Sequence, residues 1–201
     1  MLVIIDYGAG NLASVRNAFL KIGVQAAISS DPKVIVQADK AVLPGVGAFA
    51  DAMENLRRLH LDMTVKAAIE SGTPLLGICL GMQLLFTQGE EHGIHPGLDL
   101  VKGRVLRFDL PREYKVPHMG WNTIYPQEGS RLLKDIPGGS HFYFVHSYYV
   151  EPENDAAIAA RSDYGIDFVC AIEQENLFAT QFHPEKSGDM GLKILHNFAE
   201  L

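Results

Sequence analysis

The sequence is poor in cysteine and carries no excess of positive charge. Only Cys79 and Cys170 are cysteines among 201 residues, which is too few for a disulfide framework and fits a reducing compartment. The formal net charge is -7, whereas nucleic-acid partners require clustered lysine and arginine. These shortages argue against a disulfide-stapled secreted scaffold and against a nucleic-acid partner. We expect Cys170, in a strand-like stretch, to pack in the core.

Long apolar runs are also missing. The first apolar stretch, residues 1–5, is shorter than the core of a signal peptide and runs directly into Asp6. No other run approaches the ~20 residues that a membrane helix needs. We therefore expect a cytoplasmic protein with no membrane partner. With no linker or internal repeat, residues 1–201 are expected to form one domain.

Strand and helix patterns alternate through the first half of the chain. Apolar runs at 2–5, 24–28 and 41–43 predict buried strands. Apolar residues at spacings of three and four predict helices over 11–22 and 49–71, the second in two pieces. Because strand–helix alternation produces parallel strands joined by right-handed crossovers, helices are expected on both faces of the sheet.

The pattern changes after residue 96. A closing helix is predicted over 188–200. Between these points the sequence predicts successive strands, at 101–108, 122–125, 141–150, 156–160, 166–173 and 177–181. The predicted fold class is α/β: three layers, with a mostly parallel central sheet, helices on both faces and an antiparallel extension.

A reactive cysteine is indicated by Gly77-Ile78-Cys79-Leu80-Gly81. This segment follows a short apolar strand and leads into helix-forming residues 82–86. A nucleophile between two glycines at a strand–helix turn is a nucleophile elbow, here with cysteine in place of serine. The turn sets the sulfur at a helix N-terminus, where amides and the helix dipole favour thiolate. The alternative is a small buried residue, the commonest environment of cysteine.

A base for this cysteine is offered by His183. The predicted strand at 177–181 brings it to the sheet edge where a parallel strand delivers Cys79. Pro184 biases His183 toward extended backbone, so Glu185, two residues on, is expected to reach the ring nitrogen that faces away from sulfur. Alone, His183 is more simply a satisfied surface histidine. Together the two segments favour a Cys-His-Glu triad.

An acyl-transfer site also needs hydrogen-bond donors for the oxyanion. Elbow geometry supplies one, the amide of Leu80. The second is expected in the segment 44–49, whose Gly45 and Gly47 let a peptide turn its N–H inward after Pro44 ends the strand. An ordinary strand–helix turn explains this segment equally well.

Several segments resemble those of the class I (triad) glutamine amidotransferases, a family with a flavodoxin-like fold. Residues 6–12, 44–49 and 77–86 carry the resemblance to the family as a whole. Residues 117–122, 142–148 and 181–187 resemble, more narrowly, the family's glutaminase subunits of imidazole glycerol phosphate synthase. The most specific of these segments is Pro117-His118-Met119-Gly120-Trp121-Asn122. The similarity runs from residue 2 to 187. Stretches 89–100, 126–140 and 151–176 carry no matched motif.

The resemblance implies a reaction and roles for particular residues. Cys79 attacks the carboxamide of glutamine and releases ammonia, and water hydrolyses the γ-glutamyl thioester to glutamate. His183 acts as base and acid, and Glu185 orients it. The remaining implied roles are the adjustable oxyanion hole, formed by Gly45, Val46 and Gly47, and substrate binding, by Gln83, Ser147 and Tyr148. No cofactor and no metal are expected.

A partner is also implied, because the glutaminase domain takes up the whole chain and ammonia in open water becomes ammonium. The family partner is a (β/α)8-barrel cyclase, which in the heterodimer makes imidazole glycerol phosphate and AICAR in histidine biosynthesis. Candidate interface residues are Asn11, His118, Met119, Trp121, Asn122, Tyr143 and Lys186. Trp121 is expected to be a gate or an anchor at this interface, with a core position as the alternative.

Three other functions remain open from the sequence. Gly8-x-Gly10-x-x-Ala13, with Asp31 downstream, fits a short dinucleotide-binding fingerprint but leaves the cysteine elbow unexplained. A stand-alone cysteine hydrolase on the same fold would need no partner. Residues 90–95 contain metal-ligand types, but Gly93 and Pro96 favour a solvated loop there.

Overall fold

The computed structural model describes residues 1–201, and a large mixed sheet runs through it. Five neighbouring strands of this sheet are parallel. In spatial order they are β2 (Ala26–Ser29), β1 (Leu2–Ile5), β3 (Lys40–Gly45), β4 (Leu75–Cys79) and β13 (Leu177–Thr180). The parallel half therefore ends with β4 and β13 side by side.

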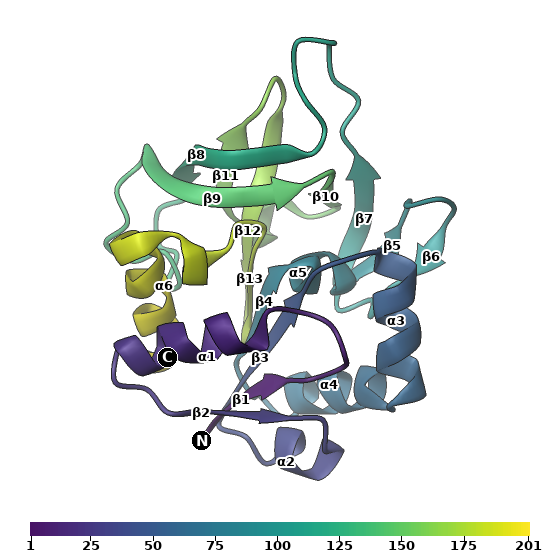
Figure 1. Cartoon of the computed structure of the whole chain (residues 1–201), viewed down its shortest axis with the longest axis vertical. Helices are drawn as coiled ribbons and strands as arrows, with labels where there is room; N and C mark the ends of the chain where they lie inside the picture. Colours follow the sequence, from purple (N-terminus) through teal and green to yellow (C-terminus); the bar gives the residue numbers. More distant parts are fainter.

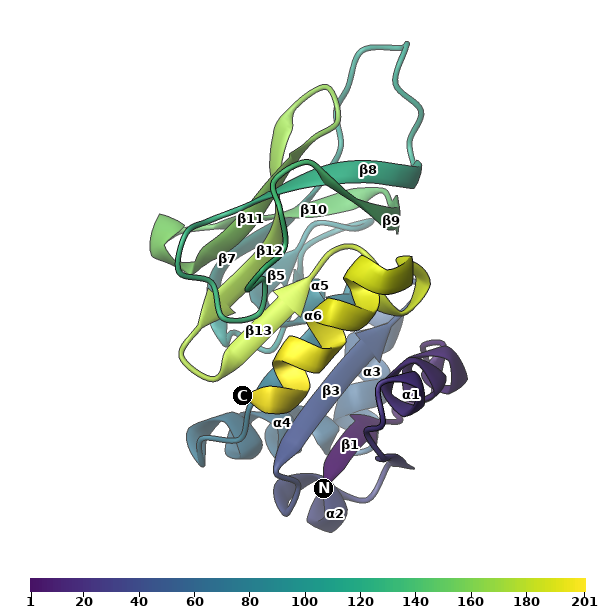
Figure 2. The same ribbon diagram turned by 90° about the vertical axis from the view of Figure 1, so that its left-hand side faces the viewer.

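Helices cover both faces of this parallel half (Figures 1 and 2). On one face lie α1 (Leu12–Lys21) and α6 (Gly188–Glu200). On the other lie α2 (Pro32–Val36), α3 (Phe49–Arg58) and α4 (Leu61–Glu70). The short helix α5 (Leu80–Leu84) follows β4 directly.

Each face of the sheet has its own apolar core, because alternate side chains of a strand point to opposite faces. Val3 of β1 packs in one core with Met53 of α3. Ile4, the next residue, packs in the other core with Phe19 of α1 and Phe198 of α6. The fully apolar strands thus give the three-layer architecture that the sequence predicts.

The second half of the sheet is mainly antiparallel. The sheet continues through β12 (Asp167–Gln174), β10 (Tyr148–Pro152), β7 (Val101–Arg107), β5 (Phe86–Gly89) and β6 (His95–Pro96). A further layer is formed by β11 (Ile158–Asp163), β8 (His118–Pro126) and β9 (Ser140–His146). Short 3-10 turns occupy Asp155–Ala157 and Pro184–Lys186.

The predicted fold class is confirmed, but several element boundaries are wrong. The helix expected through 82–86 stops at Leu84, because the carbonyl of Leu85 accepts from Leu100 and Val101 and Phe86 pairs with Val101. The single strand expected over 141–150 is two strands, β9 and β10, with a break at Ser147. The 156–160 strand starts only at Ile158, after a 3-10 turn.

The chain has neither a disulfide nor a helix suited to a membrane. No helix combines the length and apolar character needed to cross one. Both cysteines are free, and Cys170 is fully buried in the core as expected. Burial raises the pKa of the Cys170 thiol well above its usual value.

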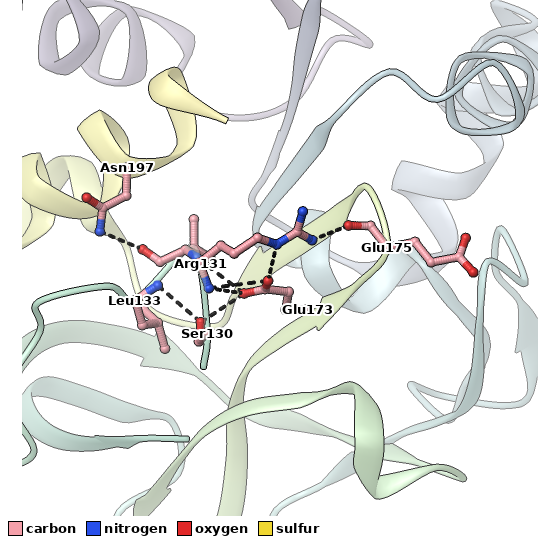
Figure 3. A network of polar contacts seen from close by, with 7 residues as sticks. Ser130, Arg131, Leu133, Glu173, Glu175 and Asn197 are labelled. Atoms are coloured by element: carbon pink, nitrogen blue, oxygen red, sulfur yellow. Dashed lines mark hydrogen bonds and ion pairs between the residues drawn. The ribbon is translucent and has the colours of Figure 1, made fainter. Parts of the chain in front are cut away.

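The loop between β8 and β9 is fastened to β12 by one carboxylate, that of Glu173 (Figure 3). Glu173 accepts hydrogen bonds from the Ser130 hydroxyl at 2.8 Å, from the Arg131 guanidinium at 2.7 Å and from the amides of Arg131 and Leu132. Burial alone would raise the pKa of Glu173, but these donors outweigh it and hold the pKa below its usual value. Arg131 also lies over the Phe178 ring, 4.8 Å from its centre.

We predict that Glu173→Gln lowers the free energy of unfolding at pH 7 by about 1–3 kcal/mol, since hydrogen bonds to a charged acceptor are lost. A carboxylate with a depressed pKa stabilises the fold above its unfolded pKa, and this contribution is lost as the pH falls. The gap between parent and variant should therefore close toward acid pH. Urea unfolding across pH measures it.

Glu175→Gln is the matched control, because Glu175 contacts Arg131 through its backbone carbonyl alone. It removes the same charge two residues away and should leave stability nearly unchanged. Equal losses in both variants would contradict the role of the Glu173 carboxylate.

Candidate active site

Cys79 stands at the end of β4 with an unusual backbone conformation. Its φ of 56° and ψ of -111° are rare for a residue with a side chain, and such strain is typical of functional turns. The turn is tight, since a Cβ on Gly81 would overlap the carbonyl oxygen of Leu43 in β3. A glycine at 81 thus permits the close approach of elbow and sheet that fixes the sulfur's position.

His183 reaches the same sheet edge from the neighbouring strand. β13 runs parallel to β4 with Thr180 opposite Ile78, so both strands end at the same edge of the sheet. The amide of His183 donates to the carbonyl of Tyr143 at 2.9 Å, which ties the loop after β13 to β9. Parallel pairing brings together two residues that are far apart in the sequence.

Glu185 is bonded to His183 deep inside the protein. His183 Nδ1 donates to Glu185 Oε1 at 2.8 Å, and the two side chains are only 3% and 2% exposed. The expectation that extended backbone would create this contact is wrong in part. His183 is extended, but a 3-10 turn over Pro184–Lys186 brings the carboxylate round to the ring. The turn leaves Nε2 facing the sulfur side.

His183 is electrostatically suited to hold a proton beside the sulfur. Burial alone would lower the pKa of His183, but the Cys79 sulfur and the Glu185 carboxylate outweigh burial and raise it to about 9. Nε2 has no hydrogen-bond partner of ordinary geometry, although Cys79 lies close enough to act on it. This raised pKa favours the imidazolium form of the ring, whose Nε2 has no other hydrogen-bond partner.

A pocket of about 320 Å³ opens over Cys79 and His183. Its lining includes most of the residues predicted for the oxyanion hole and the substrate: Val46, Gly47, Leu80, Gln83, Ser147 and Tyr148. It also includes four residues to which sequence reasoning assigned no role in the pocket: Glu91, Pro117, Val145 and His146. The pocket is large enough for a small amino acid.

Glu91 is the charged residue that sequence reasoning missed. It belongs to the segment interpreted as a solvated loop, yet its Oε2 accepts the amide of Phe49 at 2.7 Å. Phe49 is the first residue of α3, so Glu91 caps that helix from outside. The only sequence signal for it was a carboxylate within the unmatched stretch 89–100, in the segment considered as a metal site.

The strand before the predicted oxyanion segment ends one residue later than expected, at Gly45. Pro44 does not end the strand but lies within β3, opposite Ile78, and Gly45 pairs with Cys79. A Cβ on Gly45 would come within 2.7 Å of the Tyr7 hydroxyl, so the position requires glycine. Gly45 is not among the residues that line the pocket, whereas Gly47, with φ of +98°, lines it.

The Tyr7 hydroxyl is buried under this segment without a hydrogen-bond partner. Burial, aided by the nearby Cys79, raises the pKa of Tyr7 far above its usual range. Tyr7 therefore stays neutral next to the sulfur.

The predicted interface residues divide into exposed and buried ones. Met119 and Trp121 are 62% and 58% exposed on β8, which excludes a core position for Trp121. Trp121 packs edge-on against Tyr143 at 6.2 Å, and Lys186 lies 5.7 Å over the Tyr143 ring. Asn11 is exposed, and its side chain also caps α1. None of these residues lines the pocket over Cys79 and His183.

The prediction of His118 as an interface residue is wrong. Its ring is 3% exposed and stacks on Tyr164, with centroids 3.9 Å apart. The pleat of β8 turns His118 inward while Met119 points outward, so neighbouring residues of one motif face opposite ways. Half-buried Asn122 donates to the carbonyl of Asp163 at 2.8 Å.

The alternative sites have little structural support. No three histidine, cysteine or acidic side chains lie together in a way that could hold a metal ion. Asp31, the candidate ribose ligand, caps α2 by accepting the amide of Lys33 at 2.9 Å. The glycine-containing loop leads into α1, and Asn11 caps that helix by accepting the amide of Ser14 at 3.2 Å.

The family model named Glutamine amidotransferase class-I matches residues 3–201. The chain belongs to the class-I glutamine amidotransferase family. The chemistry of an amidotransferase requires a nucleophile, a base and a carboxamide pocket, and the Cys79–His183–Glu185 cluster has the matching chemical groups.

Curated relatives are similar to this chain over its whole length. Two proteins named imidazole glycerol phosphate synthase subunit HisH illustrate this. The one from Methanothermobacter thermautotrophicus is 53% identical, over 100% of this chain and 98% of its own. The one from Syntrophotalea carbinolica is 51% identical, over 100% of both chains.

Solved structures share the fold of this amidotransferase-family chain. A crystal structure of a glutamine amidotransferase superposes with a TM-score of 0.76 at 20% identity, covering 98% of both chains. A glutamine amidotransferase from Thermotoga maritima gives a TM-score of 0.66 at 14% identity, covering 99% of this chain and 82% of that one.

We predict that the three buried histidines of the site titrate far apart. His183 should take up its proton with a pKa of about 9, whereas burial lowers the pKa of His118 to about 4 and that of His146 to about 3. Nitrogen-15 NMR of the imidazole rings across pH measures this, with a His183→Asn variant to assign the high-pH signal. A neutral His183 at pH 7 would contradict the electrostatics of the site.

Proposed function

We propose that this chain is the glutaminase subunit of imidazole glycerol phosphate synthase, a cytoplasmic enzyme of histidine biosynthesis. It hydrolyses glutamine to glutamate and passes the ammonia to a cyclase subunit. One observation carries the proposal: a buried Cys79–His183–Glu185 cluster at the floor of a pocket, in a chain about half identical over its full length to curated HisH subunits.

The first chemical step forms the thioester. The thiolate of Cys79 attacks the carboxamide carbon, and the carbonyl electron pair moves onto oxygen. His183 Nε2–H then donates its proton to the amide nitrogen. The C–N bond breaks, ammonia leaves, and neutral His183 remains beside a γ-glutamyl thioester on Cys79. Glu185 keeps the ring in the orientation that points Nε2 at the reacting atoms.

The second step restores the enzyme. Neutral His183 takes a proton from water as the water oxygen attacks the thioester carbon. The C–S bond breaks, the sulfur leaves as thiolate beside the imidazolium, and glutamate is released. The amide of Leu80 and the backbone of Val46 and Gly47 stabilise the oxyanion in both steps, where one lost donor typically costs ~3 kcal/mol.

Substrate recognition fits a free amino acid. The far end of glutamine carries an ammonium and a carboxylate group. Glu91 supplies the only acidic side chain in the pocket lining, so it pairs with the ammonium. Gln83, Ser147 and Tyr148 offer polar groups for the carboxylate and the amide.

The cyclase partner, a (β/α)8-barrel in a heterodimer, docks beside the pocket mouth. Met119 and Trp121 form an exposed apolar pair on β8, and tryptophan is frequent among the energetically dominant residues of interfaces. Asn11, Tyr143 and Lys186 complete the rim. Trp121 acts as an anchor or gate, and covering the mouth keeps the released ammonia away from bulk water.

We predict that glutamate release from glutamine is slow for the isolated chain and rises sharply with the cyclase and its nucleotide ligand. Cys79→Ala should abolish glutamine-dependent synthesis and leave ammonia-dependent synthesis by the complex intact, because only the ammonia source is lost. Coupled assays with glutamine or ammonium chloride measure both.

Different results would favour other functions. Full activity without the cyclase would indicate a stand-alone cysteine hydrolase. Tight NAD binding with no thiol-dependent activity would indicate a dinucleotide-binding module. If Cys79→Ala removed synthesis from both nitrogen sources, the proposed division of labour would be wrong.

We also predict that Glu185→Gln slows glutamine hydrolysis by about 10²–10⁴-fold without erasing it, because ring orientation and imidazolium stabilisation are lost while the nucleophile remains. The variant also removes a group that raises the pKa of His183, so its pH–rate profile should shift to lower pH. Steady-state kinetics of the complex across pH test both effects. A parental rate would remove Glu185 from the triad.

A further inference from the structure

Gln181 is a fully buried residue to which the mechanism described above assigns no role. It lies between β13 and His183, and its side-chain Nε2 donates to Cys79 Sγ at 3.7 Å. The carbonyl oxygen of Val145 also lies 3.8 Å from the sulfur. A carbonyl can accept only from the neutral thiol. The Gln181 amide is therefore the contact that gains strength when the sulfur becomes a thiolate.

The orientation of the Gln181 amide is fixed by its neighbours. Gln83 Nε2 donates to the backbone carbonyl of Tyr148 at 3.2 Å and to Gln181 Oε1 at 3.0 Å. A carbonyl oxygen cannot donate, so the nitrogen of Gln83 must point this way and Gln181 must accept through its oxygen. This leaves the Gln181 nitrogen, and not its oxygen, facing the sulfur.

Two neutral histidines extend this series of hydrogen bonds beyond the Tyr148 carbonyl. The same Tyr148 carbonyl accepts from His146 Nδ1 at 2.8 Å, so His146 Nε2 is an acceptor for His118 Nδ1 at 2.9 Å. His118 Nε2 in turn accepts from Asn122 at 3.3 Å. Every donor and acceptor in the series is thereby assigned. The low pKa values of both rings agree with these neutral tautomers.

We propose that Gln181 is a catalytic residue that donates a hydrogen bond to the Cys79 thiolate, and that Gln83 and His146 are positioning residues that orient its amide. The proposal rests on the proposed glutaminase function and adds a second, uncharged stabiliser opposite His183. An amide does not titrate, so Gln181 supports the sulfur in both steps, whichever charge His183 carries.

Other titratable groups also face the sulfur or its pocket. His183 follows β13, Tyr7 follows β1, His146 ends β9, and Glu91 lies beyond β5. Glu185 acts through His183. None of these is altered by a substitution at position 181, so a change in the pH response of the sulfur reports on the amide.

The test is the rate at which iodoacetamide alkylates Cys79 across pH, followed by mass spectrometry on the full chain. Gln181→Met keeps the side-chain length and removes the donor. Its alkylation curve should move to higher pH by about one unit, which corresponds to one charge-assisted hydrogen bond. Gln181→Glu, with an acceptor in place of the donor, should move it further. Gln174→Met, the same substitution on the exposed end of β12, should not move it.

Thermal unfolding must show that each variant is folded. A folded Gln181→Met or Gln181→Glu variant whose curve overlays that of the parent overturns the proposal. If neither variant folds, the parent protein is measured instead, by following the NMR signal of the Gln181 side-chain amide across pH. The signal should shift with the same pH midpoint as alkylation. A constant signal overturns the proposal.

Alkylation needs no glutamine, so the two proposals can fail separately. A shifted curve in a chain that never hydrolyses glutamine would refute the glutaminase function alone. Glutaminase activity with an unshifted curve would refute the role of Gln181 alone.

Discussion

The candidate site depends on the parallel pairing of β4 with β13. This pairing carries Cys79 and His183, residues from distant parts of the sequence, to one edge of the sheet. Because the same edge also receives the end of β3, Gly45 lies against the elbow. Strand order therefore brings together the residues proposed as nucleophile, base and oxyanion segment.

Burial and charge act against each other within this arrangement. An imidazolium as buried as His183 would lose its proton without compensation, since desolvation lowers the pKa of a histidine. Glu185 on one ring nitrogen and the sulfur opposite the other reverse that outcome. Two nearby titratable groups favour their neutral forms: Tyr7 has a raised pKa, and His146 a lowered one.

The features that depend on local sequence patterns could be predicted from the sequence. The glycines flanking Cys79 and the alternation of strands and helices predict the elbow and its place in a parallel sheet. Tertiary contacts decided the rest. The helix after Cys79 is cut short because Leu85 is bonded to the loop before β7. Glu91 joins the pocket because it caps α3 from a distant hairpin, which no local pattern encodes.

The β8–β9 hairpin connects the two functions proposed for this face of the molecule. Its outward residues Met119 and Trp121 are exposed and belong to the proposed docking surface, and its inward residues His118 and His146 bond to each other and to the carbonyl of Tyr148 in the pocket lining. Alternation along one strand thus places partner contacts and site-supporting contacts one residue apart. His118 is linked through His146, the Tyr148 carbonyl and Gln83 to the Gln181 amide, so the hairpin that carries the proposed docking residues also supports the groups around Cys79.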